Sequence, residues 1–491
     1  MYSQVMPTCQ RILFINPYTG GVRRKANVPP VRVGYLAGIV REEGYDVEIL
    51  DMKLHCMGYI ERFLKKKDFD VIIIHVGLSF TNLSGSCYLQ SLEILETVKS
   101  SGGEYLVGLA GQYATIMGKA MTDDQIVRDT VDFVIFSEGE AVLGPLLSAF
   151  NSGHSLATVP GILYRDSDDW KKNPAAPEVN DLNTLPTPAY DLMEMSRYRN
   201  NILWTSRGCP FECIFCSTPI VYNKKYRYQS PDTVVDDMVH IIDHYGDKVF
   251  WIVDDYFFLH QDRVEAICDS IILRNLKVRW CVTAGARGEG IGKQLLAKMK
   301  RAGCAQLGFG VESGNEEVLR NLGKNVSIEK IKEITKNAQE VGIAVQYYFM
   351  IGNPGETLKY VKDTMNLIWE VIPQNVIFFE STPYQGSQLY EWVEKHGRLL
   401  RPPYGDIFAH HNNYKIEEPY FETDDFTREE RISALRKCLA LKMAFYKFPR
   451  LIYAIIKFLS DNRFRYFTDI FLITKNWIKL RLIRRRHHCR R

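Results

Sequence analysis

The chain has 491 residues, a formal net charge of +4, and 46% hydrophobic against 24% charged residues. This composition excludes a disordered or fibrous chain, and the length indicates two to four globular domains. No apolar run reaches the ~20 residues that a membrane-spanning helix needs, and no basic region with an apolar core follows Met1, as a secretory signal requires. Eleven cysteines without paired spacing are typical of a reducing cytoplasm. We therefore expect a cytoplasmic protein.

Residues 1–158 predict a doubly wound, Rossmann-like α/β domain. Helical stretches such as Val33–Glu43 and Tyr88–Ser100 separate apolar, β-branched runs that are typical of buried parallel strands. The expected strands are Arg11–Pro17, Asp46–Asp51, Asp70–Val76, Tyr105–Ala110 and Val131–Phe136. Ligands of such sheets bind beyond the carboxyl ends of the strands. The candidate binding residues there are Asn16, Gly77, Ser79, Thr81, Gly108, Gly111, Glu138 and Gly139.

Residues 159–198 are expected to link this domain to the next. The segment contains five prolines, which favour turns and extended connections over regular elements. They are Pro160, Pro174, Pro177, Pro186 and Pro188.

The cluster loop, residues 209–216, carries Cys209, Cys213 and Cys216 in a Cys-x-x-x-Cys-x-x-Cys pattern. Three thiolates on one loop can bind one metal ion or cluster, but structural zinc and ordinary iron–sulfur clusters take four protein ligands. The other eight cysteines are scattered singly. A 4Fe–4S cluster with one open iron satisfies this pattern, and a zinc knuckle with a distant fourth ligand is the alternative.

The three-cysteine pattern resembles that of the radical S-adenosylmethionine (SAM) superfamily, in which the open iron chelates SAM. Apolar strands and helical patterns then alternate through residues 199–395, which predicts right-handed βαβ units and a parallel sheet. Ser327 is a suitable N-cap for one helix. The six expected strands match the partial (βα)6 barrel of the superfamily: 202–205, 249–255, 278–283, 306–312, 345–351 and 376–382.

The resemblance implies SAM contacts at several strand ends. Glu312 lies in a Gly-Val-Glu-Ser-Gly context similar to that of a SAM-binding glutamate in cobalamin-type members. Asp254 and Asp255 occupy the position of the Gly-Gly-Glu-like motif that receives the methionine ammonium group, and Phe215 matches an aromatic residue that packs on the adenine. As alternatives, Glu312 is a solvated strand-end carboxylate and Phe215 shields the cluster.

Two further SAM contacts are implied beyond these strands. Arg287 is placed to pair with the methionine carboxylate as a bidentate fork, unless it is a surface arginine. Gly352 begins a Gly-Asn-Pro-Gly-Glu segment that resembles the turn beside the adenine. Glycine and proline also define such a turn for purely structural reasons.

The amino-terminal domain resembles the cobalamin-binding domain that precedes many radical SAM barrels. By this resemblance Ser79 and Thr81 reach the nucleotide tail, and Gly108 and Gly111 permit close approach of a large ring. The loop after the first strand contains no histidine, and His55 follows the second strand. We therefore expect cobalamin to be bound with its benzimidazole detached and with no histidine on cobalt. A flavodoxin-like domain that binds nothing is the alternative.

The carboxyl-terminal region, residues 396–491, is expected to be helical and basic. Residues 441–491 contain 14 Lys or Arg and two acidic residues, for a net charge of +12, whereas the preceding 440 residues carry −8. Residues 451–459 and 470–480 interleave apolar and cationic side chains, as an interfacial helix on an anionic membrane does. Nucleic acid is a competing partner. In a third interpretation the helices cap the barrel and residues 484–491 are disordered.

Taken together, the resemblance implies a cobalamin-dependent radical SAM enzyme that methylates an unreactive carbon of a small-molecule or lipid-like substrate. Its cofactors would be a 4Fe–4S cluster, SAM and cobalamin, with an external electron donor such as flavodoxin or ferredoxin. The same architecture also suits radical cyclisation, rearrangement or oxidation. A non-catalytic iron–sulfur or zinc protein is the second alternative. We expect it in the cytoplasm or peripherally on the inner face of the membrane, and do not expect nucleic-acid binding.

Overall fold

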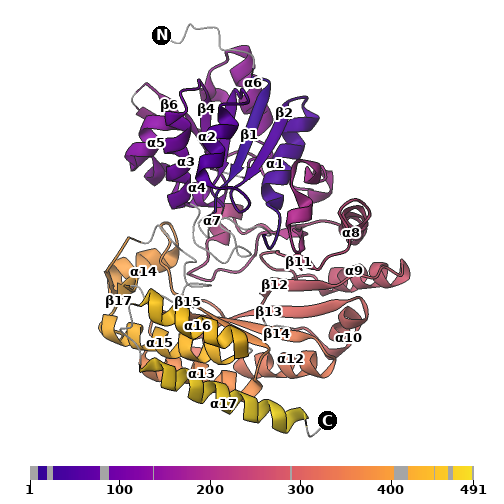
Figure 1. Ribbon diagram of the computed structural model, residues 1–491, viewed down its shortest axis with the longest axis vertical. Helices are drawn as coiled ribbons and strands as arrows, with labels where there is room; N and C mark the ends of the chain where they lie inside the picture. Colours follow the sequence, from indigo (N-terminus) through magenta and orange to yellow (C-terminus); the bar gives the residue numbers. More distant parts are fainter. Residues whose placement is uncertain are drawn as a thin grey trace. The chain divides into compact units, whose positions relative to one another are not determined.

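A computed structural model describes residues 9–18, 26–77, 88–136, 138–167, 169–287, 290–402, 418–446, 448–462 and 468–488. The chain forms two compact units (Figure 1). Unit 1 comprises Met1–Pro210 and Ser217–Asp255, and unit 2 comprises Phe211–Cys216 and Tyr256–Arg491. Of the candidate binding residues, Ser79 and Thr81 lie outside the described residues.

Unit 1 contains the predicted doubly wound sheet, in the strand order β2-β1-β3-β4-β5-β6-β7. The first five strands are parallel, and all five were expected from their apolar runs. Their central side chains, such as Ile12 and Phe14, are fully buried between helices on both faces. The bounds are β1 (Arg11–Asn16), β2 (Asp46–Asp51), β3 (Val71–His75), β4 (Leu106–Ala110) and β5 (Phe133–Ile135).

Helices cover both faces of this sheet. The predicted helices at 33–43 and 88–100 form as α1 and α3, and α1 shares one apolar core with α6. On the other side α2, α3 and α5 contact one another in turn. The helices are α1 (Val31–Glu42), α2 (Met57–Leu64), α3 (Tyr88–Ser100), α4 (Gln112–Met117), α5 (Gln125–Thr130) and α6 (Leu143–Ser152).

Part of the expected linker extends the sheet. Strands β6 (Ile162–Asp166) and β7 (Asp169–Lys172) add an antiparallel hairpin beside β5. The prolines of this segment flank the hairpin rather than interrupt it, so Ile162 and Leu163 bury their side chains. Residues 173–198 then contain only short 3-10 turns.

The remainder of unit 1 leads into and out of the cluster loop. Strand β8 (Asn201–Leu203) pairs in parallel with β11 (Phe250–Ile252). Strand β9 (Ser206–Arg207) pairs antiparallel with β10 (Arg227–Tyr228). Helix α7 (Thr218–Tyr222) directly follows the loop. Helix α8 (Pro231–Tyr245) is capped by Ser230, whose Oγ accepts a hydrogen bond from Thr233 N.

The described part of unit 2 carries four parallel strands in the order β15-β14-β13-β12, and the other two strands of the predicted set, β8 and β11, lie in unit 1. All six predicted strands therefore form. The outer helices touch in the order α9, α10, α12, α13 (Figure 1). The elements are β12 (Trp280–Ala286), β13 (Cys304–Glu312), β14 (Ala344–Ile351), β15 (Asn375–Glu380), α9 (Gln261–Leu273), α10 (Lys293–Arg301), α11 (Glu316–Asn321), α12 (Ile328–Glu340), α13 (Leu358–Val371), α14 (Gln388–His396), β16 (Arg398–Leu399) and β17 (Phe421–Glu422).

Ser327 stands at the N-cap of α12 as predicted, but its side chain makes no capping hydrogen bond. Instead Oε1 of Glu316 accepts the hydrogen bond from Ile328 N, over 3.2 Å. A neighbouring helix thus supplies the acceptor that the local sequence was expected to provide.

Three helices complete unit 2: α15 (Arg428–Ala444), α16 (Phe448–Asp461) and α17 (Asp469–His488). Helix α15 begins with a capping box formed by Thr427 and Glu430 and packs against β14, β15 and α13. Helices α16 and α17 share an apolar core with the end of α15. In the part of the chain that the structure describes, no helix is both long and apolar enough to cross a bilayer.

Candidate functional site

Asp255 holds both flanks of the cluster loop within unit 1. Its Oδ2 accepts a hydrogen bond from Gly208 N over 2.9 Å, and its Oδ1 accepts one from Thr218 Oγ1 over 3.3 Å. Gly208 has a φ of +84°, and a Cβ there would lie 1.9 Å from the carbonyl oxygen of Lys225. Only glycine fits this turn. Burial raises the pKa of Asp255, while the two hydrogen bonds favour its ionised form.

Asp254 holds the strand before the loop. Its carboxylate accepts hydrogen bonds from Thr205 N at 2.7 Å, Thr205 Oγ1 at 2.6 Å and Ser206 Oγ at 2.7 Å. These three donors occupy most of the acceptor capacity of a carboxylate. The structure therefore gives both aspartates a role in positioning the loop, and their contact with SAM stays a prediction.

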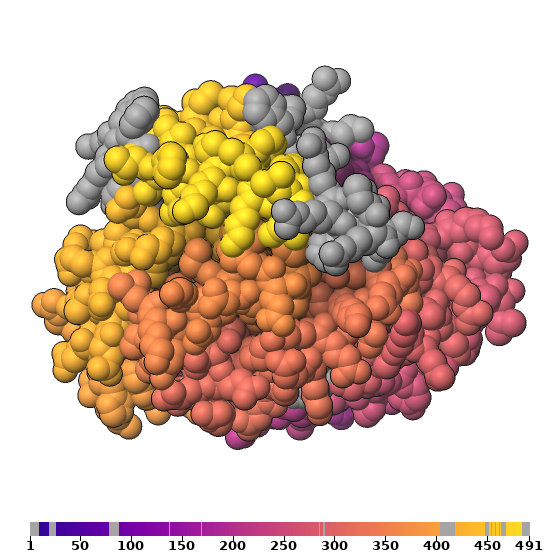
Figure 2. Space-filling view, turned by 90° about the horizontal axis from the view of Figure 1, so that it is seen from below, coloured from indigo at the N-terminus to yellow at the C-terminus, as the bar shows by residue number. Residues whose placement is uncertain are grey.

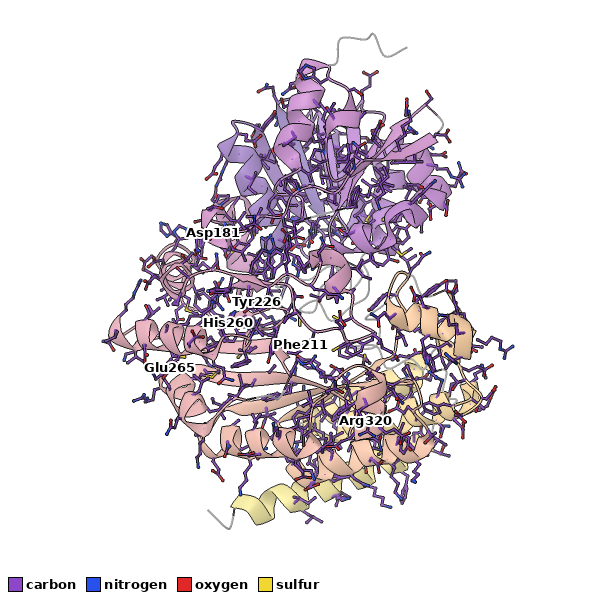
Figure 3. The ribbon with its side chains drawn as sticks, turned by 180° about the vertical axis from the view of Figure 1, so that it is seen from behind. Asp181, Phe211, Tyr226, His260, Glu265 and Arg320 are labelled. Carbon is purple, nitrogen blue, oxygen red and sulfur yellow. The ribbon has the colours of Figure 1, made fainter. Side chains whose placement is uncertain are left out.

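The three cysteines of the cluster loop are free thiols of intermediate exposure. Within unit 2, Arg287 Nη1 donates a hydrogen bond to Cys213 Sγ over 3.0 Å, and its guanidinium lies 3.7 Å from the ring centroid of Phe211, which is labelled in Figure 3. Arg287 is only 9% exposed, so the surface alternative is wrong. An arginine at this position stabilises a thiolate, the form that binds a cluster.

No group of three or more His, Cys, Asp or Glu side chains among the described residues is arranged to hold a metal ion. The donor set nevertheless fits a cluster, because eight consecutive residues carry three partly exposed thiols. Other cysteines are poor candidates, since burial raises the pKa of Cys268 to about 12 and that of Cys281 to about 11. Burial also raises the pKa of Cys304 well above its usual value. Such thiols resist ionisation.

Phe215 is anchored in unit 2 by its neighbours. Ile214 N donates to Leu322 O at 3.1 Å, and Leu389 N donates to Ile214 O at 2.9 Å. The Phe215 ring is partly buried in the apolar clusters that surround Leu322 and Leu389. Its partly exposed ring remains a candidate for contact with the adenine.

Glu312 ends β13 in a strained conformation. Its φ is +64°, and the pairing of β13 with β14 is shifted between Gly310 and Glu312. Lys324 Nζ donates to Glu312 Oε1 over 2.9 Å and also to the carbonyl oxygen of Gly310. At 9% exposure Glu312 is not a solvated carboxylate, so that alternative is wrong. Strain of this kind persists where surrounding contacts impose it, often at functional sites.

The turn that begins at Gly352 is held from two sides. Gly352 N and Asn353 N donate to Glu356 Oε2 at 2.7 and 3.1 Å, and Arg431 Nη1 donates to Gly352 O at 3.0 Å. Gly352 has a φ of +94°, where a side chain would also meet the Arg431 guanidinium. Burial raises the pKa of Glu356 to about 7. Arg431 comes from α15 and was not singled out in the sequence, because a buried helical arginine has no distinguishing local pattern.

Some candidate cobalamin residues occupy the predicted edge of the unit 1 sheet. Asn16 Nδ2 donates to Asp51 Oδ1 over 2.8 Å, and Gly77 N donates to His75 O. Gly111 has a φ of +108°, and a Cβ there would lie 2.9 Å from Val76 O. A Cβ on Gly108 would lie 2.1 Å from the Phe133 ring. Packing against this ring therefore explains why the position is a glycine. Their contact with cobalamin stays a prediction.

Two histidines lie near this edge. His55 Nε2 lies 2.5 Å from Glu194 Oε1, and its ring stacks on Tyr59. Burial and the nearby Arg32 lower the pKa of His75 to about 3, so that its imidazole is neutral.

Glu138, also predicted to contact cobalamin, is paired with two arginines. Arg227 donates to both of its carboxylate oxygens at 2.7 Å, and Arg207 Nη1 donates to Oε1 at 3.3 Å. Gly139 has a φ of +90° and packs against Leu36. Neither arginine is predicted as a site residue from the sequence. Their only signal was their position two residues before Cys209 and beside the aromatic run at Tyr226.

Comparison with protein families matches residues 205–368 to the radical SAM superfamily and residues 20–147 to the B12 binding domain. The chain contains a radical SAM domain and a B12-binding domain. These two domains imply a 4Fe–4S cluster, SAM and cobalamin as cofactors.

Several relatives align with most of this chain. An uncharacterized methyltransferase of Pyrococcus horikoshii is 27% identical over 458 residues, covering 91% of this chain and 94% of that protein. An anaerobic magnesium-protoporphyrin IX monomethyl ester cyclase of Cereibacter sphaeroides is 23% identical over 457 residues, covering 89% of this chain and 72% of that protein. The radical SAM methyltransferase TsrM of Kitasatospora setae, solved with cobalamin and a [4Fe-4S] cluster bound, has the same fold, with a TM-score of 0.68 at 15% identity over 89% of each chain.

Proposed function

We propose that the protein is a cobalamin-dependent radical SAM methyltransferase that adds a methyl group to an unreactive carbon of a small-molecule or lipid-like intermediate. The observation that carries the proposal is the combination of a B12-binding domain with a three-cysteine cluster loop in one chain. The relative from P. horikoshii, which is named a methyltransferase and aligns over 91% of this chain, supports it.

When bound, the 4Fe–4S cluster and SAM supply a carbon-centred radical, and cobalamin supplies the methyl group. Overall, one C–H bond of the substrate becomes a C–CH3 bond. One SAM leaves as S-adenosylhomocysteine, and a second leaves as methionine and 5′-deoxyadenosine, which carries the substrate hydrogen atom. An external donor of the flavodoxin or ferredoxin class supplies the two electrons that this balance requires.

The chain's own residues hold and orient these groups. Cys209, Cys213 and Cys216 would bind the cluster, and Arg287 would stabilise the Cys213 thiolate through the hydrogen bond at 3.0 Å. Glu312, with Phe215 and the turn at Gly352, would orient SAM. A pre-organised site of this kind would hold the radical near its target.

Cyclisation or another radical reaction without methyl transfer is the second candidate. The observation that favours it is the similarity to the cyclase of C. sphaeroides, which extends over 89% of this chain. The two reactions differ in the fate of SAM, since only methyl transfer produces S-adenosylhomocysteine.

The test is an anaerobic reaction of the reconstituted, cobalamin-loaded protein with a reductant (dithionite), SAM that carries a CD3 group and an extract of host metabolites. Methyl transfer predicts 5′-deoxyadenosine and S-adenosylhomocysteine in about equal amounts, as the balance above requires, with a product that is heavier by a CD3 group. 5′-Deoxyadenosine without S-adenosylhomocysteine would support the second candidate. A protein that forms neither compound, yet binds a metal, would be the non-catalytic alternative.

We further propose that unit 2 docks on an anionic membrane surface through α16 and α17. Their outward positions carry large apolar side chains at 44–79% exposure, and residues 441–491 carry a net charge of +12. Figure 2 shows these helices on one face of unit 2. Apolar side chains among cations suit a lipid interface better than nucleic acid. The exposed residues are Ile452, Ile456, Phe471, Ile478 and Leu482.

The same helices also support the capping interpretation. The buried side of α16 and α17 shares a core with α15, which packs on β14 and β15. Capping and membrane docking use opposite sides of these helices, so one does not exclude the other.

A further inference from the structure

Four buried charged side chains meet within unit 1, and we call them the arginine clamp: Glu138, Glu140, Arg207 and Arg227. Their side chains are between 1% and 8% exposed. The two glutamates follow β5 of the B12-type sheet, and the two arginines face each other across β9 and β10. The clamp therefore joins the sheet that would hold cobalamin to the strands beside the cluster loop.

The contacts in the clamp are close and numerous. Arg227 forms a bidentate fork with Glu138, with both nitrogen–oxygen distances at 2.7 Å, and its Nη1 also donates to Val179 O. Arg207 Nη1 lies 2.7 Å from Glu140 Oε1 and 3.3 Å from Glu138 Oε1. The guanidinium of Arg207 also lies 4.0 Å from the ring centroid of Trp204. Tyr226, the neighbour of Arg227, is labelled in Figure 3.

The arginines depend on the glutamates for electrostatic reasons. Like charges directly opposite each other on paired strands repel, and buried charges are costly unless they are paired. Glu138 pairs with both arginines, and Glu140, whose pKa is raised by burial although Arg207 opposes this, lies against Arg207 alone. Burial alone would raise the pKa of Glu138, but hydrogen bonds and charge attraction from Arg227 and Arg207 lower it, so this carboxylate is ionised. The pairing of β9 with β10 thus requires the residues that follow β5.

The clamp is joined to the cluster loop by the backbone, because Arg207 lies two residues before Cys209. Arg207 precedes Gly208, whose nitrogen is held by Asp255, and Cys209 follows. Beyond the loop, Tyr222 of α7 accepts a hydrogen bond from Gln112 Nε2 of α4 over 3.2 Å. Both flanks of the loop are therefore fastened to the B12-type sheet within one compact unit.

We propose that Glu138 and Glu140 are positioning residues, which hold the flanks of the cluster loop in place through Arg207 and Arg227 rather than contacting cobalamin. A fixed placement of the loop on the cobalamin-binding unit is what a reaction that uses both cofactors needs. The proposal rests on the proposed function only in assigning a cluster to Cys209, Cys213 and Cys216.

The test compares the full-length wild type with Glu138→Gln by hydrogen–deuterium exchange, without cofactors. Glutamine keeps the shape of the side chain but removes the charge and one acceptor. We expect faster exchange in residues 205–210 and 218–228, and a melting temperature lower by more than about 5 °C. Iron bound after reconstitution should fall at least about twofold, whereas hydroxocobalamin affinity should stay within about twofold. Arg41→Met, which breaks an exposed ion pair with Asp191, serves as the control and should match the wild type.

A second variant keeps the test decisive if Glu138→Gln does not fold. The double variant Glu138→Met and Arg227→Met removes one charge of each sign and leaves the pair of Arg207 with Glu140, so it should fold. Faster exchange in 218–228 is expected here too. The proposal is wrong if the double variant exchanges like the wild type. It is equally wrong if Glu138→Gln loses more than about tenfold in hydroxocobalamin affinity while exchange and iron content stay normal. Because exchange is measured without cofactors, this result does not depend on whether the protein is a methyltransferase.

Discussion

Asp255 accepts a hydrogen bond from the backbone nitrogen of Gly208, the residue directly before the first cysteine of the cluster loop, over 2.9 Å. Its second oxygen accepts a hydrogen bond from Thr218 Oγ1 on the other flank of the loop. One carboxylate therefore fixes the distance between the two ends of an eight-residue, three-cysteine segment. A loop with fixed ends loses less conformational entropy when it binds a cluster, so this carboxylate favours cluster binding.

We predict that Asp255→Asn weakens cluster assembly. Asparagine offers one good acceptor and turns an NH2 group toward the other donor. The lost hydrogen bond should destabilise the folded loop by about 1–3 kcal/mol. Iron content after reconstitution should fall, and 5′-deoxyadenosine formation should fall about tenfold with it. Asp191→Asn, at an exposed position, is the matched control. Normal iron content with a raised KM for SAM would instead identify Asp255 as a SAM ligand.

Single changes of Cys209, Cys213 or Cys216 to Ala should abolish both the 4Fe–4S spectrum and 5′-deoxyadenosine formation, because three thiolates are the minimum set for a cluster with an open iron. Cys268, Cys281 and Cys304, whose pKa values are raised by burial, should tolerate the same change without loss of the spectrum. Absorption and electron paramagnetic resonance spectra measure this. A fourth cysteine with an equal effect would exclude the open-iron site.

Glu356 should make the stability of the protein fall as the pH rises toward neutrality. Burial raises its pKa to about 7 from an ordinary value of 4.5, so the folded state binds this proton more tightly than the unfolded state does. Its stabilising contribution is complete below pH 4.5 and is lost as the pH rises through 7. Between these pH limits the free energy of unfolding should fall by on the order of 3 kcal/mol. Glu356→Gln, which does not titrate, should remove this part of the pH dependence in urea unfolding between pH 5 and 8. Parallel profiles for the two proteins would contradict the assignment.

The outward face of α17 should govern binding to anionic vesicles. The triple change of Phe471, Ile478 and Leu482 to Ser removes exposed apolar area but leaves the buried side of the helix intact. We expect weaker binding to vesicles that contain phosphatidylserine, and a salt-sensitive residual binding from the basic charge. Leu273→Ser on α9, where the side chain is 84% exposed, is the matched control. Vesicle binding equal to that of the wild type would leave α16 and α17 with the capping role alone.

His55 should not coordinate cobalt. Its Nε2 lies 2.5 Å from Glu194 Oε1, and its ring is stacked on Tyr59. With the benzimidazole of cobalamin also detached, as we expect, the cob(II)alamin form of the protein should show no nitrogen superhyperfine splitting in electron paramagnetic resonance. A splitting that disappears in His55→Ala would show that this histidine leaves Glu194 and binds the metal.

Patterns short enough to lie within one element were predictable from the sequence. The spacing of Cys209, Cys213 and Cys216 determines a three-ligand loop wherever it folds. The alternation of apolar strands with helical segments determines two parallel sheets, because each strand must bury both of its faces under crossover helices. Even there the hairpin of β6 and β7 was taken for linker, since prolines near a short strand hide its alternation.

Only the tertiary structure decided the partner of each polar side chain. Gly208 and Asp255 are 47 residues apart, Arg207 and Glu138 are 69 apart, and Gly352 and Arg431 are 79 apart. No local pattern distinguishes these buried arginines from surface ones, or a glutamate that binds a ligand from one that neutralises Arg227. Gly108 likewise suited a ligand ring in the sequence, yet the ring beside it is that of Phe133. Periodicity reports which face of an element is buried, but the pairing of charges depends on which elements the fold brings together.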